Sequence, residues 1–424
     1  MKKRTLLFIF LLICSNLSIG FCQPIEPTIT APSAILLDGD TGDILYEKDS
    51  HTPMYPASTT KIMTAILTLE NTNLNDKVII DKDSPYTGGS RIYIIEGEEF
   101  TVEQLLHALL IDSANDAAVA LAIHISDSVE DFTKLMNKRA QELGAKNTHF
   151  TNPNGLPDPD HLTTSYDLAM IAKHAMTIPK FREIVKTVKY DIPPTNKQEE
   201  TRHLYNSNRL LWGTGRRNQI LYQGKYVNIK YDIVEGIKTG YTDIARQCLV
   251  TSAKKNNHRL ISVVLKAEGK NIYIDSRTLI DYGFDNFKLK KIIDSGEKIQ
   301  SISIENGTKK SIDVLTKSPL YKVIPKNEKL GSIEQTISLN KNIKAPVEKG
   351  QSIGKITYTT DGEILGNITL IASDSVSVEK ISSFSWIKII LYFLFFLFII
   401  FLILRTIITI NRIQKRKKRL TRRL

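Results

Sequence analysis

Three short motifs contain residue types that could together carry out acyl transfer. They read Ser-Thr-Thr-Lys at 58–61, Ser-Ala-Asn at 113–115 and Lys-Thr-Gly at 238–240, in this order along a chain of 424 residues. A serine hydroxyl becomes a nucleophile when a neighbouring base takes its proton. Ser58 and Lys61 would supply this pair, and the two later motifs would supply polar groups that hold an acyl substrate.

The sequence around Ser58 separates this serine from the others that have a lysine three positions later. An apolar helical period follows it, so we expect Ser58 at the start of a helix and Lys61 one turn on, on the same face. The helix dipole there favours negative charge developing on the serine oxygen. The same spacing recurs without this context at Ser252, Ser295, Ser338, Ser352, Ser377 and Ser385.

A lysine can take the proton from Ser58 only if its own pKa falls. An unperturbed lysine has a pKa of about 10.4 and would hold its proton at neutral pH. Burial and a second nearby cation both lower this pKa, and we expect Lys238 to be that cation beside Lys61. Main-chain N–H groups of Ser58 and of the strand after Lys238 are the expected donors to the oxyanion.

The two ends of the chain predict export and membrane anchoring. Basic residues at 2–4, an apolar run at 6–13 and small residues after it are typical of a secretory signal peptide, assigned to 1–22. Residues 386–404 form an apolar run of one membrane-spanning helix, roughly 28 Å long. Nine basic residues follow in the tail at 405–424, which the positive-inside rule places in the cytoplasm. We therefore expect a single-pass membrane protein with an extracytoplasmic catalytic domain.

The net charge of +12 follows from these two ends. The chain has 57 Lys and Arg against 45 Asp and Glu, and the excess equals the basic residues of the signal peptide and the tail. The body between them is near neutral, so the charge indicates membrane topology and not nucleic-acid binding. Cys248 lies in an apolar run and has no partner in the mature body, which predicts a buried thiol and no internal disulfide.

The expected fold class is mixed α/β, followed by a small all-β domain and a transmembrane helix. We place the catalytic domain at 23–287, the β domain at 288–378 and a polar linker at 379–385. The β domain is indicated by four segments of alternating apolar and polar residues between glycines, which predict strands at 311–315, 332–338, 355–359 and 367–371. In the catalytic domain we expect a hairpin at 34–46, helices at 102–110 and 116–124, strands at 236–242, 248–253 and 260–265, and a helix at 272–284.

With these motifs the sequence resembles the D-alanyl-D-alanine carboxypeptidases among the low-molecular-mass penicillin-binding proteins. The resemblance covers about residues 34–287 and includes Phe-Thr-Asn-Pro-Asn-Gly-Leu at 150–156, His-Leu-Thr-Thr at 161–164 and Asn-Ser-Asn-Arg-Leu-Leu at 206–211. It implies the fold shared by β-lactamases and penicillin-binding proteins. It also implies that peptidoglycan stem peptides are the substrates and that β-lactam antibiotics acylate the enzyme.

The resemblance assigns a role to each motif residue. Ser58 would be the acylated nucleophile and Lys61 its base. Ser113 would relay protons, and Asn115 would hold the substrate amide. The strand edge that binds the peptide and its carboxylate would consist of Lys238, Thr239 and Gly240.

Two features depart from the pattern of these relatives. Many of them end in an amphipathic helix that lies on the membrane, whereas this chain has an apolar run long enough to span it, with Lys388 near its edge as the one charged residue. Arg246 stands where glycine is common, and we favour a solvated surface arginine over a contact with substrate. Arg209 and Arg246 are both candidate sources of positive charge for the substrate carboxylate.

No metal or cofactor is expected, because the chain has no metal-ligand motif and no Gly-rich phosphate loop. His149, His161 and His203 are scattered along the sequence, which favours structural or surface roles. A β-lactamase is an alternative function, but it needs a base for deacylation and residues 148–167 contain no glutamate. A catalytically silent peptidoglycan-binding protein is a second alternative, and the intact pair at 58–61 weighs against it.

Overall fold

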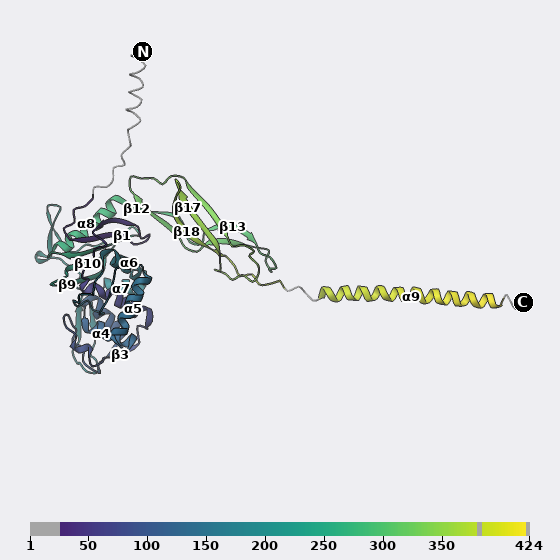
Figure 1. The fold of residues 1–424 in the computed structure, drawn as a ribbon, viewed down its shortest axis with the longest axis horizontal. Coiled ribbons are helices and arrows are strands. Elements are labelled where there is room, and N and C mark those ends of the chain that lie inside the picture. The colour runs from purple at the N-terminus through teal and green to yellow at the C-terminus, as the bar shows by residue number, and fades with distance from the viewer. Residues whose placement is uncertain (1–25, 380–383, 421–424) are drawn as a thin grey trace, which may run out of the picture. The chain divides into compact units, whose positions relative to one another are not determined.

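The computed structural model describes residues 26–379 and 384–420 (Figure 1). The predicted signal peptide at 1–22 and residues 380–383 of the predicted linker lie outside this described part. The chain divides into a mixed α/β unit and an all-β unit that is followed by a long helix. The predicted fold class is therefore confirmed.

The two units are interleaved along the sequence. The first unit runs to Ile292 and also takes in Tyr321–Leu330, while the remaining residues form the second unit. The later stretch belongs to the first unit because strand β15 (Leu320–Pro325) pairs with strand β12 (Phe287–Ile293). The sequence analysis did not predict either of these strands.

A five-stranded antiparallel sheet forms the centre of the first unit, with the strand order β2-β1-β11-β10-β9. Every residue of β1 is buried, and its alternate side chains enter two cores. Ile35 and Leu37 face the larger core, whereas Ala34 and Leu36 face a smaller one to which helix α8 contributes. These elements are β1 (Ser33–Asp38), β2 (Ile44–Lys48), β9 (Val234–Thr242), β10 (Arg246–Lys255), β11 (His258–Ala267) and α8 (Asn271–Asn286), so the predicted hairpin, strands and closing helix are present.

Helix α2 (Lys61–Asn71) is the central element of the larger core. Its residues from Lys61 to Thr68 are all buried, and it contacts each of the surrounding helices. Thr101, Ser128 and Thr164 begin three of these helices by accepting a backbone N–H in the first turn. The surrounding helices are α3 (Val102–His107), α4 (Asn115–Ser126), α5 (Val129–Glu142), α6 (Ser165–Ala175) and α7 (Pro179–Lys186).

Short hairpins and single turns complete the first unit. Three two-stranded sheets lie in its connections, one between α2 and α3 and two between α7 and β9. Their strands are β3 (Lys77–Ile79) with β4 (Glu99–Thr101), β5 (Lys189–Ile192) with β6 (Arg202–Tyr205), and β7 (Gln219–Tyr222) with β8 (Lys225–Asn228). The turns are η1 (Ala57–Thr60), η2 (Ser84–Tyr86), η3 (Ala108–Asp112) and η4 (Arg216–Asn218).

The second unit contains a five-stranded antiparallel sheet with the order β13-β14-β18-β17-β16. Strands β14, β17 and β18 alternate buried and less buried residues along most of their length, which is the pattern of a sheet with one covered face. The sequence predicted four of the strands and missed β13. Their bounds are β13 (Lys298–Ser303), β14 (Ser311–Thr316), β16 (Ile333–Leu339), β17 (Ser352–Thr360) and β18 (Glu363–Ala372).

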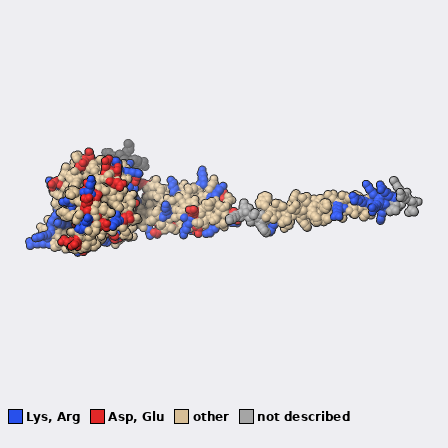
Figure 2. Space-filling view, turned by 90° about the horizontal axis from the view of Figure 1, so that it is seen from below, with Lys and Arg blue, Asp and Glu red and all other residues tan. Residues whose placement is uncertain are grey.

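Helix α9 (Phe384–Leu420) follows the second unit and contains the predicted apolar run at 386–404. Residues Trp386–Arg419 are long and apolar enough to cross a membrane, and none of the most apolar stretch is buried inside the protein. Lys and Arg gather at its C-terminal end, whereas acidic and basic residues are mixed on the visible face of the first unit (Figure 2). An apolar helix whose side chains are exposed throughout 386–419 is suited to lipid surroundings.

Candidate active site

Ser58 lies in the single turn η1, directly before α2, and its side chain is half-buried. Two threonine hydroxyls hold this turn: Thr59 donates to the carbonyl of Pro56 at 2.7 Å and Thr60 to that of Ala57 at 2.9 Å. Ala57 has a φ of 49°, in the left-handed region that L-residues rarely adopt. The backbone therefore turns sharply just before Ser58, and Ser58 precedes the α-helix in a 3₁₀ turn.

His161 supports the same turn from behind. Its Nε2 lies 2.8 Å from the hydroxyl oxygen of Thr60, and its Nδ1 accepts the backbone N–H of Thr151 at 3.0 Å. Burial lowers the pKa of the imidazole to about 4, so it is neutral at physiological pH. This agrees with the structural role expected from the sequence.

Lys61 is completely buried and has three oxygen partners. Its Nζ lies 3.0 Å from Ser58 Oγ, 2.6 Å from Asn115 Oδ1 and 2.6 Å from the carbonyl oxygen of Asn154. A neutral amine has two N–H donors and one lone pair. Because the carbonyl and amide oxygens can only accept, a neutral Lys61 would donate to both and accept the hydroxyl proton of Ser58.

The surroundings of Lys61 favour this neutral form. Burial lowers its pKa well below the ordinary lysine value, the charge of Lys238 lowers it further, and the carboxylate of Asp116 opposes both. The sequence had predicted the effect of Lys238 and not the contribution of Asp116. That carboxylate lies 3.3 Å from the backbone nitrogens of Ile92 and Ile94.

Ser113 and Asn115 are positioned by a change of helix type. Helix α3 continues into a π-helical turn, η3, which ends at Ser113 with a left-handed φ of 66°. Helix α4 then begins at Asn115, whose Nδ2 donates to the carbonyl of Gly88 at 2.7 Å. This bond leaves Oδ1 of Asn115 directed at Lys61, which fixes the orientation of the amide.

The third motif lies on β9, at the edge of the central sheet. β9 pairs with β10 on one side, where Lys238 stands opposite Val250. Lys238 and Gly240 are buried, whereas Thr239 is half-exposed and its Oγ1 lies 2.6 Å from Ser207 Oγ. A Cβ at Gly240 would lie 2.9 Å from the backbone nitrogen of Ser58. Only glycine therefore allows β9 to run this close to the serine.

Lys238 is the second buried lysine of the site. Burial lowers its pKa to about 7, and the charge of Asp112 acts in the opposite direction. Burial also raises the pKa of Asp112, the residue directly before Ser113. Lys238 thus changes its charge near neutral pH, with Asp112 favouring the charged form.

These residues surround a cavity of about 460 Å³. Ser58, Ser113, Thr239 and Gly240 line it, while Lys61, Asn115 and Lys238 lie behind this wall. All seven predicted site residues are therefore brought together. The wall also includes residues that the sequence analysis did not single out for the site: Asp112, Ser207, Lys270 and Tyr273.

The positive charges at the cavity come from residues other than Arg246. Arg209 and Lys270 line the wall. Lys270 donates to the backbone carbonyls of Arg217 and Gln219, both at 3.0 Å, and so ties the wall to the β7–β8 segment. Arg246 is about half exposed, lies 3.5 Å from Glu268 and does not line the cavity, which agrees with the solvated role favoured from the sequence.

In the part of the chain that the structure describes, neither Cys248 nor a group of possible metal ligands adds a second reactive centre. Cys248 is buried, and burial raises the pKa of its thiol to about 12. A thiol with this pKa is not nucleophilic at neutral pH. Among residues 26–379 and 384–420, no group of three or more His, Cys, Asp or Glu side chains could hold a metal ion.

Comparisons with known proteins identify relatives of both units. Residues 22–269 match the family profile described as D-alanyl-D-alanine carboxypeptidase, and residues 287–378 match the C-terminal domain of penicillin-binding protein 5. The chain is 35% identical to D-alanyl-D-alanine carboxypeptidase DacF of Bacillus subtilis, over 82% of this chain and 86% of that protein. It is 32% identical to DacA of Haemophilus influenzae, over 85% of this chain and 88% of that one.

Solved structures of related proteins match the fold of this chain. The structure of penicillin binding protein 5 from Haemophilus influenzae aligns with a TM-score of 0.63 at 32% identity, covering 83% of this chain and 99% of that one. A peptidoglycan synthesis regulatory factor from Streptococcus pneumoniae aligns with a TM-score of 0.65 at 27% identity, covering 83% and 100%. Both matches extend well past the first unit.

Proposed function

The chain belongs to the D-alanyl-D-alanine carboxypeptidase family, and on this premise we propose that it removes the terminal D-alanine from peptidoglycan stem pentapeptides through an ester on Ser58. The observation that carries the proposal is the set of three oxygens around Lys61 Nζ. Two of them can only accept, so a neutral Lys61 has its lone pair left for the hydroxyl proton of Ser58.

Acylation would begin with transfer of this proton. Ser58 Oγ attacks the carbonyl carbon of the penultimate D-alanine while Lys61 takes the hydroxyl proton. The negative charge that develops on the carbonyl oxygen would be stabilised by backbone N–H groups of Ser58 and of β9 after Gly240. As the C–N bond breaks, the leaving amine receives a proton through Ser113, and free D-alanine departs.

Deacylation would use water in place of the serine. Water attacks the ester carbonyl, its proton passes to the base, and the Ser58 oxygen is reprotonated. The segment around Asn154 contributes a backbone carbonyl and no carboxylate next to Lys61. A class A β-lactamase uses a glutamate for this step. A β-lactam ester should therefore hydrolyse slowly, which favours a target of β-lactams over a β-lactamase.

Substrate binding would use the free edge of β9. An extended peptide can add to an unpaired strand edge through main-chain hydrogen bonds. Thr239 and the charged form of Lys238 would then bind the terminal carboxylate. Arg209 and Lys270, which line the same cavity, would add positive charge. A silent binding protein would have no need for a lysine buried against a serine.

The C-terminal helix would anchor the enzyme in the cell membrane. Its basic end favours a cytoplasmic tail, with both units outside the cytoplasm. This placement agrees with a peptidoglycan substrate. We retain the assignment of 1–22 as signal peptide, 23–287 as catalytic domain, 288–378 as β domain, 386–404 as membrane span and 405–424 as tail.

The direct test is release of D-alanine. The protein in neutral detergent is incubated with a stem pentapeptide ending in D-Ala-D-Ala, and free D-alanine is measured over time. We expect release by the wild type and none by Ser58→Ala, with equal thermal unfolding of both proteins. Release by the Ser58→Ala protein, or no release by a wild type that still binds penicillin covalently, would overturn the proposal.

A further inference from the structure

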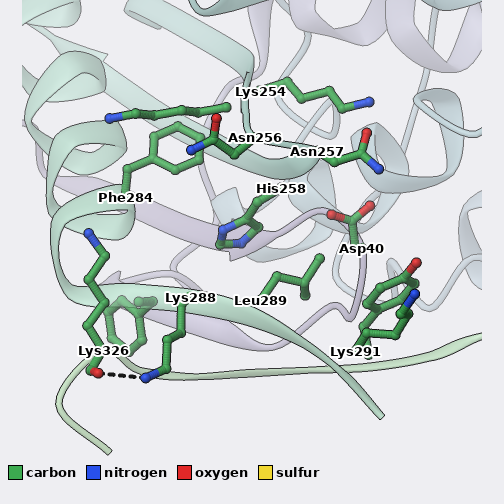
Figure 3. A pocket seen from close by; sticks show the side chains of 13 residues that line it. Asp40, Lys254, Asn256, Asn257, His258, Phe284, Lys288, Leu289, Lys291 and Lys326 are labelled. Carbon is green, nitrogen blue, oxygen red and sulfur yellow. Dashed lines mark hydrogen bonds between the residues drawn. The ribbon is translucent and has the colours of Figure 1, made fainter. Parts of the chain in front are cut away.

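A second hollow in the first unit collects five lysine side chains away from Ser58. Its volume is about 640 Å³, and Figure 3 shows the side chains around it. Lys254 and Lys255 come from the β10–β11 hairpin, Lys288 and Lys291 from β12, and Lys326 follows β15. Segments far apart in the sequence therefore bring like charges to one place.

This hollow is separate from the cavity at Ser58. No residue lines both of them. Lys238 of the active site stands opposite Val250 on β10, and Lys255 is five residues farther along this strand. At the rise of an extended chain this separation is about 17 Å. The lysines of the hollow therefore make no contact with the reacting atoms.

The positive charge of the hollow is poorly balanced by its own residues. Asp40 is the one acidic side chain among those that line it, and its carboxylate accepts the backbone N–H of Arg259 at 3.1 Å. In the described part of the chain, no carboxylate lies within ion-pair distance of Lys254, Lys255 or Lys326. Repulsion between like charges would be relieved by a bound anion.

The hollow also offers amide groups and an apolar floor. Asn256 and Asn257 form the tight turn of the hairpin with φ values of 50° and 67°, and their side chains line the hollow. Phe284, Leu289 and Tyr321 supply apolar surface between the lysines. Cations around an apolar floor suit a ligand whose anionic groups are joined by carbon segments.

We propose that this hollow binds a phosphodiester chain, with the phosphates at the lysines and the carbon segments on the apolar floor. Lysine binds phosphate as a point charge, and several lysines on separate segments can contact successive phosphates. The volume lies in the range of ligand-sized pockets and exceeds what one phosphate would fill. A concave site also suits a chain better than the flat surface of a lipid bilayer.

The test measures protection of individual lysines from acetylation by mass spectrometry. The full-length protein in neutral detergent is labelled with and without a glycerol-phosphate oligomer at fixed salt, because phosphate binding depends on salt. We expect slower acetylation of Lys254, Lys255 and Lys326. The exposed lysines elsewhere on the same unit, which should not change, are Lys82, Lys138 and Lys146.

Two variants with equal loss of charge separate a built site from general attraction. The first replaces Lys254, Lys255 and Lys326 by Gln, and the second replaces Lys82, Lys138 and Lys146 by Gln. In the first we expect the oligomer concentration for half-protection of Lys288 and Lys291 to rise at least about tenfold, the loss expected for charge-assisted contacts. The second should bind as the wild type does, and both should acylate with penicillin normally.

Several outcomes would overturn the proposal. Uniform protection of all lysines, equal weakening in the two variants, or no protection at all would each show that the hollow is not a site for the chain. Vesicles containing phosphatidylglycerol form a second arm of the experiment. If vesicles protect the hollow and the oligomer does not, the hollow recognises a lipid bilayer, and binding of a phosphodiester chain is refuted.

Discussion

Gly240 gives the sharpest test of how closely β9 must approach Ser58. A Cβ at this position would lie 2.9 Å from the nitrogen of Ser58, 3.1 Å from the Cβ of Ala57 and 3.1 Å from the carbonyl oxygen of Pro56. Ordinary carbon contacts lie near 3.5–4.0 Å. Gly240→Ala therefore requires β9 and η1 to separate by about half an ångström or more, on the basis of these contact distances.

This separation should act mainly on the reaction. A misplacement of about 1 Å in a catalytic site can cost about a hundredfold in rate. Overpacking a buried site costs about 1–3 kcal/mol of folding stability. We therefore expect Gly240→Ala to fold with a lowered Tm and to be acylated by penicillin roughly a hundredfold more slowly, since the serine and the strand edge no longer match.

Gly283 in α8 provides a matched control. A Cβ there would lie 2.5 Å from Leu260 Cδ1 and 2.8 Å from Leu36 Cδ2, so Gly283→Ala overpacks a core that contains no site residue. Both variants should lose stability, and only Gly240→Ala should lose acylation. The assay compares the second-order rate of acylation by a fluorescent penicillin with the Tm of each protein. Acylation of Gly240→Ala at near the wild-type rate, or equal loss in both variants, would refute the reasoning.

Three further predictions concern the same site, and a fourth concerns helix α9. Mass spectrometry should locate a stable penicilloyl ester on the peptide that contains Ser58, and Lys61→Ala should abolish it; an adduct on another serine would contradict the assignment. Lys238 has a pKa near 7 and is charged below it, so kcat/KM for an acid-terminated peptide should fall as the pH rises through about 7, whereas the amidated peptide should lack this fall. Amidation should itself lower kcat/KM by at least about tenfold, and Thr239→Val should remove most of the difference; equal cleavage of acid and amide would exclude recognition of the carboxylate. Alkaline carbonate should leave the full-length protein in the membrane, and extraction would exclude a spanning helix.

The sequence predicted the elements whose signal is periodic or depends on a motif. The helical period after Ser58 predicted α2, and strands were predicted at the third motif and in the two segments that follow it, which correspond to β9, β10 and β11. Burial of Lys61 near Lys238 was expected from chemistry, because a serine nucleophile needs a neutral base. These features are local in the sequence, or follow from what the reaction requires.

Other parts of the site have no local signal. The carbonyl oxygen of Asn154 is a partner of Lys61, and a backbone atom leaves no mark in the residue types of a sequence. The π-helical turn at η3 depends on how α3 meets α4, and its apolar residues also fit an ordinary helix. β15 was missed because its partner β12 comes from before the second unit, so that neither strand belongs to a sequential hairpin.

The two buried lysines have different tasks, and their surroundings differ accordingly. Lys61 has two obligate acceptors and one hydroxyl around Nζ, an arrangement that a neutral amine satisfies completely. Lys238 has the charge of Asp112 beside it, which favours its protonated form. Burial and the charge of Lys238 lower the pKa of Lys61 well below the ordinary lysine value, whereas the pKa of Lys238 is lowered to about 7. Below a pH of about 7 the proton therefore resides on Lys238, where it can bind a carboxylate, and its charge keeps Lys61 free to act as the base.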